Sequence, residues 1–333
     1  MIKIATKTIA AIRQGIEKDQ GTAFRKALQD LLPKMEDAYR ESGKGYRSHL
    51  GASLIGRDCA FELWLGYRWV EKATFNERIL RLFNRGHLEE ARFLAMLISA
   101  GIEVWYETET GGQFKFSDID GHFGSSLDGI VIVPDLNEAA YAEFKTHGDK
   151  SFKKLQKEGV QNSTYEHYVQ MQICMDAYDL KYGVYFAVNK NDDDLHIEIV
   201  KLDKEVVKAY RTRARGIIYA QEAPPRISNK SSWYQCKFCN KKDVCHNKAK
   251  PDINCRTCAL AHPTKTGWSC SRSRPELQDS PELGCEEHIY HPSLLQSVQL
   301  VEISSEGYLE LKMEDGRIVK HGKGHVSSKD LEL

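Results

Sequence analysis

A single hairpin, ended by a short charged motif, limits the possible folds of this chain more than any other stretch. Residues 121–133 read G-H-F-G-S-S-L-D-G-I-V-I-V; a polar turn over 134–137 follows, and then A-A-Y-A-E-F-K, which ends at Lys145. Two apolar runs bounded by turn residues predict neighbouring β-strands. Because side chains alternate along a strand, we expect Glu143 and Lys145 on one face and Phe144 on the other, toward the core. If the strands pair, Asp128 comes close to Glu143.

Two converging carboxylates beside a lysine predict a metal-dependent phosphodiesterase site. Carboxylate and carbonyl oxygens suit a hard divalent cation such as Mg²⁺ or Mn²⁺, which polarises a phosphate and lowers the pKa of a bound water. Asp128, Glu143 and the carbonyl of Phe144 are the expected metal ligands, and Lys145 is expected to orient the water or stabilise the developing charge. The alternative is an ordinary strand end with two solvated charges.

The spacing of G-S-S-L-D-G-I-V and E-F-K resembles that of the PD-(D/E)XK nuclease superfamily, and within it the RecB-like exonucleases. Over residues 46–250 the alternation of strands and helices suggests an α/β core with a mixed sheet, and the resemblance implies a restriction-endonuclease-like core flanked by helices. RecB-like nucleases complete the metal site with a Glu, often with a His nearby, on the helix before the hairpin. That resemblance points to Glu90 first and Glu89 second, with His87 as a ligand or a neighbour of one.

The same family carries a Gln-x-x-x-Tyr motif on the helix after the E-x-K strand, where it contacts DNA. Gln170 matches its first position, but Cys174 stands where the Tyr belongs. Gln172 and Tyr178 are the residues that could share the role. Cys174 itself lies between Ile173 and Met175 and is predicted to be a buried thiol.

Charge gives no global signal for a nucleic-acid partner, since Lys plus Arg and Asp plus Glu both total 47. Any DNA-binding surface must therefore come from local patches. The clearest patch follows Lys145, and its lysines could lie against DNA phosphates or simply form a solvated helix face. Its members are Lys150, Lys153, Lys154 and Lys157.

Nine cysteines in a chain whose N-terminus does not resemble a signal peptide favour metal ligation over disulfides. Cys236, Cys239 and Cys245 give C-x2-C-x5-C, three thiolates of a four-ligand site whose fourth ligand could be His246, in a zinc site, or a distant cysteine. Helicase-linked and CRISPR-adaptation RecB-like proteins hold a [4Fe-4S] cluster with one upstream and three downstream cysteines. That resemblance assigns Cys59 as the fourth ligand and implies a structural cluster, with zinc as the alternative.

A second cysteine set predicts a zinc ribbon. Cys255, Cys258, Cys270 and Cys285 provide four thiolates for Zn²⁺, and His288 or His291 could replace one of them. Side chains around the ribbon offer charge and a stacking surface that hint at nucleic acid. These are Arg256, Lys265, Trp268, Arg272 and Arg274.

The sequence thus predicts four parts: a helical lead-in over 1–45, the nuclease core over 46–250, the ribbon over 251–292 and a small β-meander tail over 293–333. The stretch H-L-G-A-S-L-I-G-R-D-C over 49–59, the nuclease motifs and the trailing ribbon together resemble the stand-alone RecB-like exonucleases of bacteriophages. The resemblance implies a cytoplasmic enzyme that cleaves DNA ends in recombination, replication or DNA degradation, with a recombination or replication protein as a possible partner. Strand polarity, endonuclease action and oligomeric state stay open. The alternative is a nucleic-acid-binding or scaffold protein in which the ribbon is the binding module.

Overall fold

A six-stranded mixed sheet lies at the centre of the computed structural model, which describes residues 2–35, 45–272 and 281–332. The strand order is β1-β9-β8-β7-β6-β3; β7 and β8 run parallel, and each other neighbouring pair is antiparallel. This arrangement confirms the coarse part of the predicted fold class, an α/β core with a mixed central sheet. The strands of this sheet are β1 (Lys3–Ile4), β3 (Glu103–Trp105), β6 (Gly129–Ile132), β7 (Ala140–His147), β8 (Tyr182–Asn189) and β9 (Leu195–Lys201).

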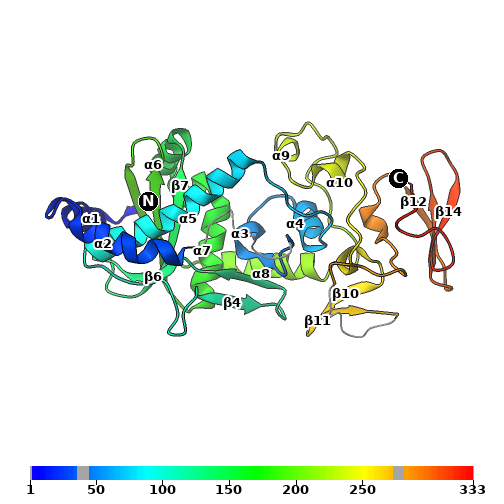
Figure 1. Ribbon diagram of the computed structural model, residues 1–333, viewed down its shortest axis with the longest axis horizontal. Helices are drawn as coiled ribbons and strands as arrows, with labels where there is room; N and C mark the ends of the chain where they lie inside the picture. Colours follow the sequence, from blue (N-terminus) through cyan, green and yellow to red (C-terminus); the bar gives the residue numbers. More distant parts are fainter. Residues whose placement is uncertain (1, 36–44, 273–280, 333) are drawn as a thin grey trace.

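Helices cover both faces of the sheet, so its strands are buried on both sides (Figure 1). One face packs against α1 (Thr6–Glu17), α2 (Thr22–Leu31) and α5 (Glu77–Ser99), and the other against α6 (Asp149–Ser163) and α7 (Tyr165–Ala177). Phe144 belongs to the first face, where its ring stacks on Phe93 of α5 at 5.0 Å. Tyr141 and Tyr185 belong to the second face.

The N-terminal segment is helical, as predicted, but it also contributes a strand to the sheet. β1 pairs with β9 at one edge. The start of α1 is capped by Asp135, whose carboxylate accepts hydrogen bonds from the backbone N–H of Lys7 (3.1 Å) and of Thr8 (2.7 Å). These contacts place the segment in the same core as α5; residues 36–44 of the predicted lead-in lie outside the described residues.

The first apolar run of the hairpin forms two strands rather than one. β5 (Phe123–Ser126) joins a separate sheet of order β2-β5-β4, and the chain then turns through Leu127 and Asp128 into β6. The pairing of β6 with β7 is the predicted hairpin. The remaining elements of this half are β2 (Leu50–Gly51), α3 (Ala52–Ile55), α4 (Ala60–Tyr67), β4 (Lys115–Asp118), α8 (Lys204–Ile218), α9 (Tyr234–Lys237) and α10 (Lys242–His246).

The C-terminal part contains a two-stranded sheet, β10-β11, and the predicted β-meander, β12-β13-β14. The meander lies at the opposite end of the long axis from α1 and α2 (Figure 1). One hydrophobic cluster nevertheless includes Leu63 and Val244 together with Cys258, Trp268 and Leu294. These strands are β10 (Ala261–Thr264), β11 (Gly267–Cys270), β12 (Gln299–Ile303), β13 (Tyr308–Lys312) and β14 (Ile318–Gly322).

Arg256 links the C-terminal part to the segment around the end of α4. Its guanidinium lies between aromatic rings from both parts. The guanidinium lies 3.8 Å from the ring centre of Trp69 and 4.9 Å from that of Trp268, and it donates hydrogen bonds to the carbonyls of Tyr67 (3.2 Å) and Ser48 (2.6 Å). Burial lowers the pKa of Arg256 to about 10. Arg256 and Trp268 are buried, at 6% and 7% exposure, so the prediction that they offer a surface to nucleic acid is wrong. Arg274 lies outside the described residues.

In the described parts of the chain, no helix is both long and apolar enough to cross a membrane.

Candidate active site

The hairpin brings Asp128, Glu143 and Lys145 together. Gly129 pairs with Ala142, so the preceding Asp128 lies opposite Glu143, and its Oδ2 accepts a hydrogen bond from the backbone N–H of Phe144 at 2.8 Å. Glu143 is fully buried. Its two oxygens accept hydrogen bonds from the Tyr141 hydroxyl and the Lys145 ammonium. Glu143 is therefore not a solvated charge at the end of a strand, whereas the Lys145 side chain keeps 26% of its surface exposed.

Burial raises the pKa of Glu143 to about 7; Lys145 opposes this rise and Asp128 adds to it. Burial alone would lower the pKa of Lys145, but Glu143 and Asp128 together raise it above its ordinary value. Lys145 therefore stays protonated beside two carboxylates that repel each other. That repulsion is what a bound cation would relieve.

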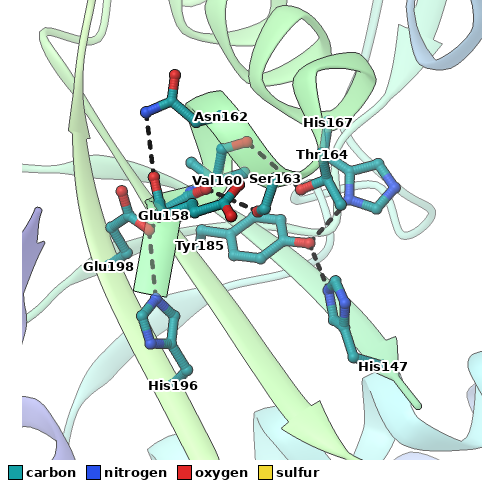
Figure 2. Close-up of polar contacts among 11 residues, drawn as sticks. His147, Glu158, Val160, Asn162, Ser163, Thr164, His167, Tyr185, His196 and Glu198 are labelled. Atoms are coloured by element: carbon teal, nitrogen blue, oxygen red, sulfur yellow. Dashed lines mark hydrogen bonds and ion pairs between the residues drawn. The ribbon is translucent and has the colours of Figure 1, made fainter. Parts of the chain in front are cut away.

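A buried polar network adjoins this group, and the sequence analysis did not find it. Tyr185 pairs with Glu143 in the parallel ladder. Its hydroxyl lies 2.8 Å from Nε2 of His147 and 2.8 Å from Nδ1 of His167, as Figure 2 shows. Nδ1 of His147 lies 2.8 Å from the Ser151 hydroxyl. Burial lowers the pKa of His147 to about 4 and that of His167 to about 3, with Lys145 contributing to both shifts, so both rings are neutral near pH 7.

The alternation of side chains along β7 is the sequence signal that could have identified His147 as part of the site. Tyr141, Glu143, Lys145 and His147 alternate along the strand and share one face. The sequence therefore gave grounds to add His147 to the site. Tyr185 could not be added in this way, because its position depends on the register of a strand some forty residues later.

The helix residues predicted to complete the metal site lie on α5. Glu89 is buried and pairs with Arg92 at 3.0 Å, and burial raises its pKa. Glu90 and His87 line a groove together with Thr146 of β7. Among the residues that the structure describes, no group of three or more His, Cys, Asp or Glu side chains is arranged to hold a metal ion, so metal ligation stays a prediction.

The first cysteine set converges, although its members are far apart in sequence. Cys59, Cys236, Cys239 and Cys245 line a single pocket with His246. Burial raises the pKa of Cys239 to about 12 and of Cys245 to about 11, and nearby cysteines of the set add to both shifts. Nε2 of His246 is buried without a hydrogen-bond partner. The four thiols share a pocket, but among the described residues they are not arranged to hold a metal ion, so an iron–sulfur cluster or zinc here stays a prediction.

In the second cysteine set, Cys258 is a buried thiol. Burial raises the pKa of Cys258, and Cys270 and Cys285 raise it further. His288 and His291 do not compete for a metal, because both nitrogens of each ring contact hydrogen-bond partners. Cys255 begins the short 3₁₀ turn Cys255–Thr257 beside them.

The predicted DNA contacts occupy helices on the face of the sheet that carries Tyr185. All four lysines of the patch are exposed on α6, but Lys153 pairs with Asp149 at 2.9 Å and Lys154 with Glu158 at 3.8 Å, which lowers the net charge of the patch. Gln170 and Cys174 are buried on α7, and the prediction of a buried thiol at Cys174 is confirmed. Gln172 and Tyr178 hydrogen-bond to backbone groups, Gln172 to Lys201 and Asp203 and Tyr178 to Lys115.

Comparison with known proteins adds little to this geometry. No family model and no curated protein matches the chain. Among solved structures it is similar to LHK-Exo, an alkaline exonuclease from Laribacter hongkongensis, with a TM-score of 0.37, 18% identity, and coverage of 51% of this chain and 86% of that one. LHK-Exo in complex with dAMP gives 17% identity with the same TM-score and coverage. A protein called SSO0001 gives a TM-score of 0.37 and 12% identity, covering 68% and 95% of the two chains. At these TM-scores the likenesses decide neither fold family nor function.

Proposed function

We propose that this chain is a divalent-metal-dependent DNA exonuclease with a PD-(D/E)XK-type core, which hydrolyses phosphodiester bonds at DNA ends. The observation that carries the proposal is a fully buried Glu143 that contacts Lys145 and lies beside Asp128 at the junction of β6 and β7, with Asp128 and Lys145 half-buried. Burying a carboxylate such as Glu143 costs stability, and residues with pKa values perturbed by burial and a charged partner gather at functional sites.

Each member of the group has a role in this proposal. Asp128, Glu143 and the carbonyl of Phe144 hold Mg²⁺ or Mn²⁺, and Glu90 (or Glu89) and His87 approach from α5. A bound ion supplies polarisation of the scissile phosphate and a water of lowered pKa. Lys145, held protonated by its neighbours, stabilises charge that develops on the phosphate oxygens. Tyr185 is the partner of Glu143 in the ladder between β7 and β8, and in this proposal it helps to hold the face of β7 from which Lys145 projects.

The cysteine sets have structural roles in the same proposal. Cys59, Cys236, Cys239 and Cys245 hold a [4Fe-4S] cluster or a zinc ion that joins α4 to α9 and α10, and Cys255, Cys258, Cys270 and Cys285 hold Zn²⁺. Metal bound at such sites adds its binding free energy to the stability of the fold.

The test is cleavage of linear and covalently closed DNA, single- and double-stranded, in Mg²⁺ and in Mn²⁺. Wild type should degrade linear DNA from its ends, and Glu143→Gln should be inert because it removes a charged ligand without changing the shape of the side chain. Glu138→Gln, a carboxylate that pairs with Lys181 at the surface before β7, is the control and should cut normally.

Two results would change the conclusion. Cutting of closed circles would make the enzyme an endonuclease. Binding of DNA by wild type without any cleavage would favour the nucleic-acid-binding or scaffold alternative.

A further inference from the structure

A long groove runs from Glu90 of α5 and Thr146, the residue after Lys145, toward the cysteine pocket. Its inner part, of about 930 Å³, is lined by Glu90 and Thr146, and its outer part, of about 600 Å³, reaches Lys241. The two parts are continuous, since Arg47 and Phe83 line both. Any polymer with one end at Glu90 would therefore extend along this groove.

One face of α5 forms a wall of the groove. Phe83, Gly86, His87 and Glu90 line it, and their spacing of three, four and seven residues places them on one side of a helix. With a rise of 1.5 Å per residue, Phe83 lies roughly 10 Å along the helix from Glu90. A ligand that contacts Glu90 therefore needs to extend only about 10 Å along the helix to contact Phe83.

The groove exposes aromatic rings that the fold does not use. Phe75 and Phe83 are 39% and 41% exposed, and their rings meet edge to face at 4.9 Å. Leu82 beside them is 42% exposed. Large apolar side chains gathered on one surface mark a place where something binds.

Gly86 leaves the helix backbone open at the centre of this wall. It lies inside a helix of 23 residues, where glycine weakens the helix, and a Cβ built on it would meet nothing within 4 Å. No neighbouring atom of the protein requires glycine at this position. A ligand that approaches the backbone closely would require it.

Cations in the groove match a phosphate backbone. Arg47 and Lys190 line the inner part, and in the described part of the chain neither forms an ion pair. Free cations beside exposed aromatic rings are the chemistry that binds single-stranded nucleic acid, because phosphates pair with the cations and unpaired bases stack on the rings.

We propose that this groove binds the single-stranded end of the DNA substrate, with a base stacked on the Phe75–Phe83 pair and the backbone passing close to Gly86. The proposal rests on the proposed nuclease function, since Glu90 marks the end of the groove where cleavage would occur. Base faces in a duplex are covered by neighbouring base pairs, so rings that stack on bases select an unpaired strand.

The sharpest test compares two glycines. Gly86→Ala and Gly216→Ala each add a methyl group to an open helix position, but Gly216 lies on α8 outside the groove. Both variants should raise the melting temperature. Only Gly86→Ala should weaken the binding of a single-stranded oligonucleotide, measured by fluorescence anisotropy in a Glu143→Gln background that prevents cleavage. Equal binding by both variants would overturn the proposal.

The stacking site is tested with an oligonucleotide that carries 2-aminopurine near its end. The ring pair should quench its fluorescence, and Phe83→Ala should relieve the quenching and weaken binding about tenfold or more. Ile98→Ala removes a side chain of similar exposure, 42%, from the same helix outside the groove and should change neither reading.

These outcomes separate the two proposals. Normal cleavage by wild type with unchanged binding by Phe83→Ala and Gly86→Ala overturns the groove proposal and leaves the nuclease. Lack of cleavage by wild type, with binding that both variants weaken, overturns the nuclease and leaves a single-strand binding groove.

Discussion

Replacing Arg256 with methionine should destabilise the protein by about 3 kcal/mol. Each hydrogen bond from the guanidinium to the carbonyls of Tyr67 and Ser48 is worth about 1.5–3 kcal/mol, and the contact with Trp69 about 1–2 kcal/mol. Burial lowers the pKa of Arg256 from its ordinary value to about 10, which corresponds to a cost of about 3 kcal/mol for keeping the charge inside. The contacts therefore exceed the cost by about 3 kcal/mol.

Urea unfolding followed by tryptophan fluorescence measures this difference. Arg256→Lys should be no better than Arg256→Met, because one ammonium cannot reach both carbonyls. Arg13→Met removes an exposed arginine, paired with Asp194 at 3.6 Å, and should change the free energy of unfolding by less than about 0.5 kcal/mol. If Arg256→Met unfolds at the wild-type urea concentration, the contacts only balance the cost of burial and the reasoning is refuted.

Three further predictions concern the polar network and the cysteines. His147 and His167 have lowered pKa values, so their contribution to stability is complete above pH 6.5 and is lost as the pH falls toward 4; urea unfolding between pH 4 and pH 8 should show this slope. Tyr185→Phe leaves both rings without their shared partner and should lower the free energy of unfolding by about 1–3 kcal/mol, with a wild-type result arguing against the network. Anaerobically purified protein should contain iron and absorb in the visible range, whereas the Cys59→Ser variant should lose both the iron and the absorbance. Zinc found in place of iron would identify the first cysteine set as a zinc site.

The sequence predicted those parts of the site that depend on local pattern. The two-residue period of β7 and its short link to β6 are enough to bring Asp128 to Glu143, because a hairpin closes within a few residues. The burial of Glu143 was not predicted, since it depends on α6 and α7 covering that face. Tyr185 arrives through a parallel register that no local pattern specifies.

The difference between local pattern and tertiary packing also explains the wrong prediction outside the site. Arg256 lies in a polar segment, and polar composition predicted an outward-facing side chain. Its aromatic neighbours Trp69 and Tyr67 come nearly two hundred residues earlier in the chain, so only tertiary packing shows the burial. Cys59 was assigned to the same ligand set as Cys236 by resemblance alone, because the two residues are too far apart in the sequence for a spacing argument. In the structure both residues line one pocket.

The two-residue strand β1 covers part of the outer edge of the central sheet. Lys3 and Ile4 pair with Ile199 and Glu198 and so occupy the outer hydrogen-bonding groups of part of β9. An open strand edge is a template for pairing with another chain. A version shortened to begin after α1 would retain the residues of the candidate active site but leave this edge of β9 uncovered, and it should aggregate during expression.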